Sequence, residues 1–339
     1  MRKKVIRNAV VILCVTYGAV LMAGFFAPYD PVEQDREHPF APPMRLHFID
    51  AEGKLHLWPF VYTWVPKPEA FTEYDLGQPF PLRLVVKGGD YKIIGSISSS
   101  WHLFGLEGGE HFYLLGTDGY GRDVFSRLLW GGRISLAAGL IATLLSLSIG
   151  LLAGVSSGYF GGIVDEAIMR LAELFLAIPW LYLLLAVRAF LPLRINPLEA
   201  FLLLIAVIGA VGWARPARLI RGVVLSAKER NYVLAAKGFG ASDFYVMRRH
   251  VLPQTIGVVL TQAALLIPQY ILAEVTLSFL GIGVGEPVPS WGNMLGALQQ
   301  YHVLASYWWM LAPALALIPV FWAYAALADF LHVRLEFRH

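Results

Sequence analysis

Apolar and polar stretches alternate along this chain on a scale of about 20 residues, the length that an α-helix needs to cross a lipid bilayer. Six apolar runs approach that length: 9–27, 134–155, 165–191, 198–214, 254–280 and 308–331. This pattern predicts six transmembrane helices, the third of which is bent by Pro179. Six such runs are hard to reconcile with the buried helices of one soluble enzyme.

Composition supports the same class of protein. Of 339 residues, 57% are hydrophobic and only 15% are charged, and the mean hydropathy is +0.58. Soluble domains are about a quarter charged. The net charge of +3 requires no nucleic-acid partner, because the basic residues follow the membrane topology. The single cysteine, Cys14, excludes an internal disulfide.

Basic residues mark three segments that should face the cytoplasm. The segment 215–253, between the fourth and fifth runs, holds eight Lys and Arg residues against two acidic residues. Both ends of the chain are also basic, through Arg2, Lys3, Lys4, Arg7, His332, Arg334, Arg338 and His339. Because basic loops stay on the cytoplasmic side, we predict an uncleaved first span and cytoplasmic termini.

The basic segment has a helical pattern of its own. Residues 229–239 predict a short helix, and its apolar patch would consist of Tyr232, Val233, Ala235 and Ala236. Gly238 and Gly240 should end this helix, since glycine accepts the left-handed conformation that follows a helix.

A second short helix should follow this reversal. Ser242 or Asp243 can cap its N-terminus. The basic residues 248–250 suit the negative end of a helix, so we expect the helix to end there. Pro253 would then occupy the first turn of the next span, where a missing N–H costs nothing. The result is a helix–glycine–helix elbow.

Residues 28–132 predict a long external segment. Alternating apolar residues at 82–87 and 91–94 indicate a few strands. Farther along, Asp123 can cap a short interfacial helix over 124–130, which Gly131 and Gly132 would end.

Small residues recur every fourth position in the second run: Ala138, Ala142, Ser146, Gly150, Gly154 and Gly158. Such a face lets helix backbones approach closely in lipid. It predicts helix packing within the subunit, with a dimer interface as the alternative.

Charged and aromatic residues in the later runs are further candidates. Glu166 and Arg170 are spaced as a helical ion pair, and Glu173 follows them. Glu274 lies well inside the fifth run, where an acid should face protein or water. Trp291, Trp308 and Trp309 fall where an outer aromatic belt is expected.

Motifs for catalysis and for nucleotide or metal binding are absent from the sequence. It contains no G-K-[ST], no H-E-x-x-H, no G-x-S-x-G and no Cys/His ligand spacing. In the external segment, His56, His102 and His111 are scattered without ligand spacing. We therefore expect no catalytic residue, no cofactor and no bound metal.

Two stretches resemble the membrane (permease) subunits of ABC-type importers. The elbow is similar to their signature loop, E-A-A-x3-G-x9-I-x-L-P, through Ala235, Ala236, Gly240, Leu252 and Pro253, whereas Leu234 and His250 depart from it. Residues 116–136 read G-T-D-x-x-G-R-D-V-x-S-R-L-x-x-G-x-R-x-S-L, which resembles the C-type subunit of dipeptide/oligopeptide importers. The strings around Glu274 and 289–294 are also family-like. A shorter first loop in that family makes residues 45–112 look like an insertion, either decoration or a docking surface for a binding protein.

The resemblance implies an all-α fold of six transmembrane helices in the inner membrane. Its parts would be a tail and first span (1–30), an external loop (31–130) and a transporter domain (131–332) with a coupling loop over 215–253. The implied coupling residues are Tyr232, Ala235, Ala236, Gly240, Asp243, Leu252 and Pro253. Pathway or structural candidates are Glu173, Glu274, Trp291 and Asn293.

The resemblance also implies the partners: a second homologous permease subunit, two cytoplasmic ATPase subunits, a substrate-binding protein outside, membrane lipid and a peptide substrate. The expected function is the transmembrane pathway of an ATP-driven peptide importer. A gradient-driven secondary transporter or channel, a membrane enzyme, and an importer of nickel or another small solute stay open as alternatives.

Overall fold

The computed structural model describes residues 2–64, 75, 78–93, 97–106, 110–179, 182–183, 185–186 and 196–336. The chain divides into two compact units. One comprises Met1–Ile12, Ala137–Glu274 and Val320–His339, and we call it the elbow unit. The other comprises Leu13–Leu136 and Val275–Pro319, and we call it the sheet unit.

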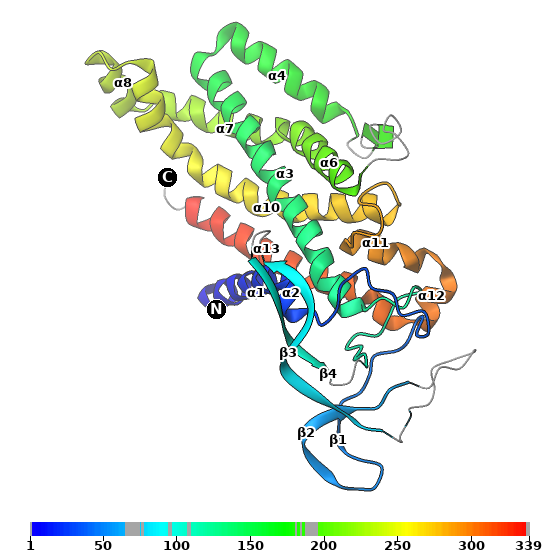
Figure 1. Cartoon of the computed structure of the whole chain (residues 1–339). Coiled ribbons are helices and arrows are strands. Elements are labelled where there is room, and N and C mark those ends of the chain that lie inside the picture. Colours follow the sequence, from blue (N-terminus) through cyan, green and yellow to red (C-terminus); the bar gives the residue numbers. More distant parts are fainter. Residues whose placement is uncertain are drawn as a thin grey trace. The chain divides into compact units, whose positions relative to one another are not determined.

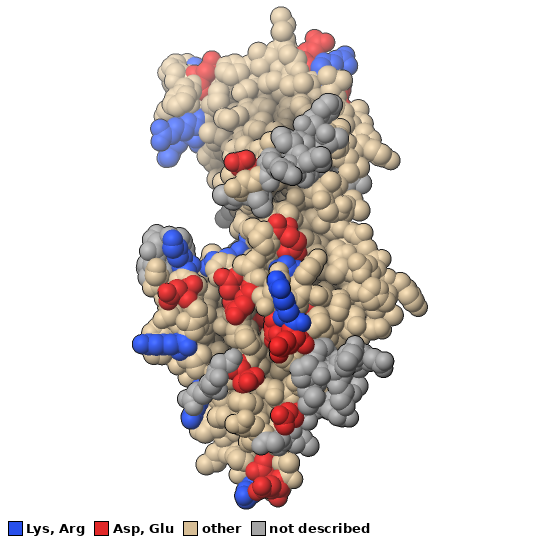
Figure 2. Space-filling view, turned by 45° about the vertical axis from the view of Figure 1, so that its right-hand side comes forward, with Lys and Arg blue, Asp and Glu red and all other residues tan. Residues whose placement is uncertain are grey.

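Within the described residues, five helices are long and apolar enough to cross a membrane: Lys3–Leu21, Val124–Phe160, Glu199–Lys228, Asp243–Phe279 and Trp308–Val333. They match the first, second, fourth, fifth and sixth predicted spans. Broad parts of the surface in Figure 2 carry no charged side chain, which is typical of helices that face lipid. The predicted third span extends beyond the described residues.

The start of that third stretch is α4, Gly162–Ala177. Its last residue is followed by Ile178, whose ψ of 122° is extended. A residue that precedes proline is pushed out of the helical region by the proline ring, so Pro179 ends this helix rather than bending it. Arg170 pairs with Glu173, with 3.4 Å between Nη1 and Oε2, in place of the expected pair with Glu166.

The other helices of the elbow unit follow the apolar runs (Figure 1). They are part of α1 (Arg2–Leu21), α3 (Val124–Phe160), α6 (Pro197–Gly212), α7 (Ala214–Lys228), α8 (Asn231–Gly238), α9 (Asp243–Val246), a π-helical turn (Met247–Val251), α10 (Leu252–Phe279) and α13 (Ala312–Glu336).

The small-residue face of α3 packs inside the elbow unit, as predicted. A Cβ on Gly154 would lie 2.6 Å from the Ala217 carbonyl, and one on Gly158 would lie 2.8 Å from Val224. Both contacts are with α7. Glycine therefore allows the two helix backbones to approach, which is the usual source of helix association in lipid.

The expected break after Trp130 is wrong, because α3 runs without interruption through Gly131 and Gly132. Both glycines are needed for space. A Cβ on Gly131 would lie 3.2 Å from the Ser290 backbone, and one on Gly132 would lie 2.8 Å from Val20. The intrinsic preference of glycine for helix ends is overridden here by tertiary packing.

The sheet unit contains four antiparallel strands in the order β1-β2-β3-β4, visible in Figure 1. They are β1 (His47–Ile49), β2 (Leu55–Val61), β3 (Phe80–Ile93) and β4 (Ile97–Leu106). The all-α expectation is therefore wrong for this part of a mostly helical chain. The strands predicted at 82–87 and 91–94 belong to one strand, β3, whose register shifts between Lys87 and Tyr91; residue 94 lies outside the described residues.

Short helices complete the sheet unit: α2 (Ala23–Phe26), α11 (Trp291–Gly296), the 3₁₀ turns Ala297–Gln299 and Trp308–Leu311, and α12 (Tyr301–Ser306). Its cores combine aromatic side chains with methionine and valine. One gathers Met44, Val61, Phe112 and Tyr113, and another gathers Met294, Trp309 and Met310. A polar site lies beside the second core and is described below.

Candidate functional site

The basic segment 215–253 begins as a helix rather than as a loop. Its first third is α7, whose buried face contains Ala217, Ile220 and Val224. That face meets the glycines of α3. This stretch is helical although it is polar, because one face of the helix is apolar and buried and the basic residues lie on the opposite face. The elbow proper is thus 229–251.

The first elbow helix, α8, forms close to the predicted bounds. Its predicted apolar patch divides between two faces. Val233 is completely buried, and Ala236 packs beside it in a core with Val155 and Val246. Tyr232 and Ala235 are exposed. The side of α8 that is free to meet another molecule is therefore the side of Ala235, and Ala236 serves the internal core.

The chain reverses at Gly240, as predicted. Gly240 has φ of +84°, and its N–H donates to the Lys237 carbonyl at 2.9 Å. The Ala241 N–H donates to the Ala236 carbonyl at 3.0 Å. This pair of bonds is a Schellman motif, which requires a left-handed residue at the position of Gly240. Ser242 then caps α9 by accepting a hydrogen bond from the Tyr245 N–H.

The predicted end of the second elbow helix is wrong. Helix α9 continues through the π turn directly into α10, so residues 248–250 lie inside a longer helix. Pro253 gives the physical reason. Its ring would collide with a carbonyl one turn earlier in a regular α-helix, and a wider π turn, closed by the Leu252 N–H on the Met247 carbonyl, precedes it.

Several large apolar side chains of the elbow face outward, and the sequence reading did not single them out. Phe239 is 93% exposed and Phe244 is 71% exposed. Leu234 and Tyr245 are also exposed. The signal that could have predicted this exposure is that these apolar residues, although they lie in a basic segment, do not fall on the buried face of a helix. A cluster of this kind typically marks a surface that another protein covers.

The elbow is tied to the end of α3 by polar contacts. The Tyr159 hydroxyl donates to Asp243 Oδ1 at 2.5 Å, and Lys237 Nζ lies 3.2 Å from the same oxygen. Lys237 also lies 4.7 Å from the centre of the Tyr159 ring. Its contacts with Tyr159 and Asp243 raise the pKa of Lys237, so the side chain is charged at neutral pH. Nothing in the sequence indicated that Tyr159 would reach this site.

A second tie holds α4 against α7. Arg221 Nε donates to Asp165 Oδ1 at 2.6 Å, and Ser157 donates to the same carboxylate. Lys228 Nζ reaches the Tyr159 carbonyl at 3.2 Å, at the C-terminal end of α3, where a positive charge is favourable.

Two of the pathway candidates lie in the elbow unit, in different surroundings. Glu173 is exposed and takes part in the Arg170 ion pair. Glu274 is completely buried near the end of α10. Its side chain therefore faces protein, as expected for an acid inside a span.

The other two candidates hold the loop after α10 in the sheet unit. Trp291 is 2% exposed, and its Nε1 donates to the Leu128 carbonyl at 2.9 Å. Asn293 forms a capping box with Ser290 and donates from Nδ2 to the Val288 carbonyl at 2.8 Å. Trp309 is buried as well, and Trp308 is exposed. The expected outer belt is thus wrong for Trp291 and Trp309.

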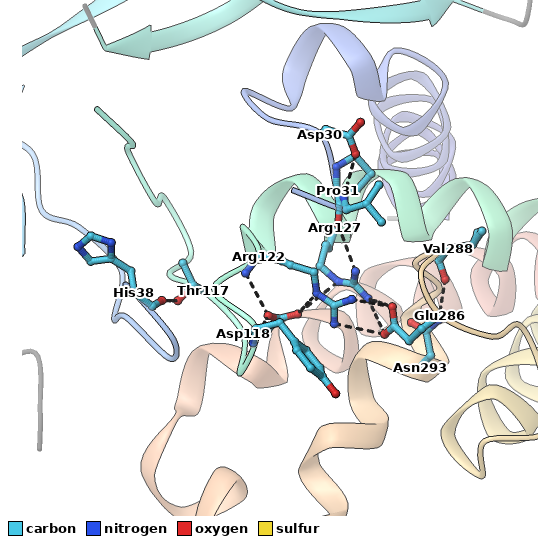
Figure 3. A network of polar contacts seen from close by, with 12 residues as sticks. Asp30, Pro31, His38, Thr117, Asp118, Arg122, Arg127, Glu286, Val288 and Asn293 are labelled. Atoms are coloured by element: carbon cyan, nitrogen blue, oxygen red, sulfur yellow. Dashed lines mark hydrogen bonds and ion pairs between the residues drawn. The ribbon is translucent and has the colours of Figure 1, made fainter. Parts of the chain in front are cut away.

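An ionic network, buried except for the half-exposed side chain of Glu286, lies in the same unit (Figure 3). We define it as Asp118, Arg122, Arg127 and Glu286. Arg122 Nε donates to Asp118 Oδ2 at 2.7 Å, and Nη1 donates to Glu286 Oε2 at 2.7 Å. Arg127 Nη2 donates to Glu286 Oε1 at 2.9 Å. Burial disfavours the charged guanidinium of Arg122, but Asp118 and Glu286 outweigh it and raise its pKa.

The turn that carries this network explains the glycines of the family-like stretch. Gly116 and Gly121 have φ of +71° and +73°. A Cβ on Gly121 would lie 1.7 Å from the Asp35 carbonyl oxygen. No other residue fits there. The motif therefore encodes a tight turn that brings Asp118 beside Arg122.

Asp123 caps α3, as predicted: its Oδ2 accepts from the Ser126 N–H at 2.7 Å. Its side chain is almost fully buried. Burial raises the pKa of Asp123 to about 6, against the hydrogen bonds from Ser126, which lower it. This carboxylate differs from those of the network, because the structure records no hydrogen-bond partner for its Oδ1.

Among the described residues, no group of three or more His, Cys, Asp and Glu is arranged to hold a metal ion. The three histidines named from the predicted external segment serve separate contacts. His56 pairs with Asp50, His102 bonds the Ala27 and Gly89 carbonyls, and His111 lies 3.8 Å from Glu33.

Comparison with known proteins identifies the family. The family described as "Binding-protein-dependent transport system inner membrane component" matches residues 146–338. The dipeptide transport system permease protein of Bacillus subtilis is 36% identical over 67% of this chain and 68% of its own length. The oligopeptide transport system permease protein of Haemophilus influenzae is 36% identical over 67% and 71% of the two chains.

A third relative is the glutathione transport system permease protein of Pectobacterium atrosepticum, 34% identical over 68% of this chain and 74% of its own length. The matched family region contains the whole elbow, and the strands β1–β4 lie outside it. The chain belongs to the family of inner membrane components of binding-protein-dependent transport systems.

Proposed function

We propose that this chain forms half of the transmembrane pathway of an ATP-driven importer for peptides, with the elbow as its contact to an ATPase subunit. The relatives are named as permeases for dipeptides, for oligopeptides and for glutathione, which is itself a tripeptide, and this supports a peptide cargo. The chain supplies the pathway and the transmission, and ATP is bound and hydrolysed by its partners.

One observation carries the coupling role: the elbow presents large exposed apolar side chains on a rigid base. Phe239 directly follows α8 and Phe244 lies in α9, and Val233 and Val246 anchor these two helices in a core. Exposed aromatic residues on a fixed scaffold are typical anchors of a protein interface. An ATPase surface that covers them would gain apolar burial without having to order the elbow first.

The proposed assembly contains this chain, a second homologous permease subunit, two ATPase subunits and a substrate-binding protein. The proposed location of the chain is the inner membrane. The predicted topology has six spans, with both termini and the elbow on the cytoplasmic side. The strands β1–β4 then lie on the side of the binding protein. Closure of the ATPase pair around ATP would pull the elbows together and switch the pathway between its two orientations, a rigid-body transition.

The proposed pathway residues are Glu173 and Glu274, with Trp291 and Asn293 in the supporting loop. Tyr232, Ala235, Gly240 and Asp243 belong to the coupling site, Ala236 supports it from the core, and Leu252 and Pro253 join it to α10.

The coupling role is tested by placing a charge on the exposed face. Phe239→Asp and Ala235→Glu should lower ATP-dependent peptide uptake and the amount of ATPase that co-purifies, because a charge would be buried without a partner. Phe48→Asp and Ala305→Glu are matched controls, since both residues are exposed in the sheet unit. Wild-type uptake and wild-type ATPase recovery in both elbow variants would reject the coupling role.

The cargo is tested separately with the complete transporter in vesicles. Uptake of a labelled dipeptide, a labelled pentapeptide and labelled nickel is compared, with ATP inside and the binding protein outside. Peptide accumulation that needs ATP supports the proposal. Accumulation of nickel alone, or of any solute with an ion gradient in place of ATP, would contradict it.

A further inference from the structure

The far end of α3 and the elbow share one carboxylate, although their residues lie far apart in the sequence. Tyr159 is the penultimate residue of α3 and is 5% exposed. Its hydroxyl donates to Asp243 at the start of α9 at 2.5 Å. Lys237, in the last turn of α8, approaches the same oxygen of Asp243 from across the glycine turn. Three helices thus converge on one atom.

The turn between α8 and α9 is held on its backbone by the Schellman motif and the Ser242 cap, but its exposed side has few side-chain contacts. A Cβ on Gly238 or Gly240 would meet no atom within 4 Å, so this part of the turn is not packed. The valines of the shared core hold one side of each helix. The contacts of Asp243 are the described side-chain bonds that cross from α8 to α9 and from α9 to α3.

These contacts are poorly suited to a stabilising role. Lys237 is 39% exposed and Asp243 is 64% exposed at the side chain. Exposed ion pairs contribute little to stability, because water screens the charges and the side chains lose freedom. What the arrangement does define is geometry, since one carboxylate oxygen accepts from two donors on two different helices.

We propose that Tyr159, Lys237 and Asp243 form a positioning lock, which makes the elbow move as one body with the end of α3. The inference rests on the proposed coupling function. An ATPase that displaces the exposed face of the elbow then displaces α3 as well, and the movement is not absorbed by bending at the glycine turn. The three side chains are positioning residues, because they act through the apolar surface that meets the partner.

The lock predicts a specific defect in the assembled transporter. Tyr159→Phe keeps the ring in its core and removes only the hydroxyl, and Asp243→Ala removes the shared acceptor. In vesicles containing the complete transporter and binding protein, the number of peptides imported per ATP hydrolysed should fall about fivefold or more, the lower range of coupling between sites. The ATPase subunits should co-purify in wild-type amounts, because the exposed apolar face is unchanged.

A double variant separates a lock from two unrelated effects. Residues that act through one contact give non-additive effects, so Tyr159→Phe with Asp243→Ala should be no worse than the more severe single variant. Asp243→Asn keeps an acceptor for Tyr159 and should recover part of the transport ratio. Glu166→Gln is the matched control, because it removes an exposed charge of the same unit that does not reach the elbow.

The lock is overturned by a wild-type transport ratio in both single variants, or by losses that multiply in the double variant. Loss of the ATPase subunits from the complex would also overturn it, since the residues would then support docking rather than transmission. ATP-dependent peptide uptake by the wild-type complex is measured before any variant is compared. If the wild-type complex shows none, the proposed function itself fails.

Discussion

The two groups of charges in this chain use similar residues for opposite purposes. In the ionic network of the sheet unit, three of the four members are buried, with Arg127 only 1% exposed, and Glu286 is 46% exposed. In the lock of the elbow unit, Asp243 is 64% and Lys237 is 39% exposed at the side chain, and only Tyr159 of the three is buried. In the network, two arginines share Glu286, and in the lock one carboxylate serves a tyrosine and a lysine.

This difference in burial decides what each group can do. Removing one partner of a buried pair leaves another charge without compensation, which destabilises a protein strongly. Removing an exposed pair usually changes stability by less than about 1 kcal/mol. We therefore expect the network to maintain the fold around residues 116–136, and the lock to affect transmission while leaving folding nearly unchanged.

The largest effect should come from Arg127→Met. The variant leaves Glu286, whose side chain is 46% exposed, paired only with Arg122, and it removes the charge-assisted hydrogen bonds of Arg127 to Glu286 and to the Pro31 carbonyl, so the cost should be about 1.5–3 kcal/mol. The amount of folded, membrane-inserted protein should fall sharply, as measured by detergent extraction and size-exclusion chromatography. Arg170→Met is the control and should give wild-type amounts. Normal abundance of Arg127→Met would remove the distinction between the two groups.

The outcome for the sequence predictions follows the same division. The apolar runs predicted the long helices well, because a period and a length are enough to recognise a span. The reversal at Gly240 and the cap at Ser242 were also predictable, since each depends on a local preference of one residue. Helix α3 was divided incorrectly at Gly131 and Gly132, because only the packing of Ser290 and Val20 shows that these glycines provide space.

The candidate site was predicted in position but not in detail. Spacing placed the elbow, and the family resemblance named Ala235 and Ala236 together. It could not show that Ala236 is part of a core, because that depends on Val155 of a distant helix. Tyr159 was missed for the same reason. A contact between residues 84 positions apart leaves no periodic trace in a single sequence.

A smaller effect is expected from Asp123, the buried carboxylate that lies outside both groups. Its pKa is raised from 3.8 to about 6, so its charge at neutral pH costs about 3 kcal/mol of folding free energy at most. This cost is present above the folded pKa and disappears as the pH falls through 6 toward 3.8. Relative to Asp123→Asn, the wild type should therefore gain about 1 kcal/mol between about pH 7.5 and about pH 5.

The measurement for Asp123 is the difference in thermal midpoint between wild type and variant, in detergent, at the two pH values. Asparagine is as good a helix cap as aspartate, so the variant retains α3. Other titrating groups cancel in the difference. A difference that is independent of pH would contradict the raised pKa of Asp123. A wild type that loses stability relative to the variant on acidification would show that the pKa is lowered instead.

The sharpest test of the comparison comes from two glycines of the elbow, one of which, Gly238, should show the smallest change in stability. Gly240 has a positive φ, whereas Gly238 is the last residue of α8, and neither has atoms within 4 Å of an added Cβ. Alanine at 240 must therefore adopt a strained backbone at a cost of about 1–2 kcal/mol, with no steric clash. Alanine at 238 should be neutral or slightly stabilising, because glycine weakens a helix.

Gly240→Ala should lower the number of peptides imported per ATP hydrolysed, with abundance close to wild type, and Gly238→Ala should leave both unchanged. Equal transport by the two variants would mean that the angle of the elbow has no part in transmission, and the contrast between a network that maintains the fold and a lock that maintains an angle would no longer hold.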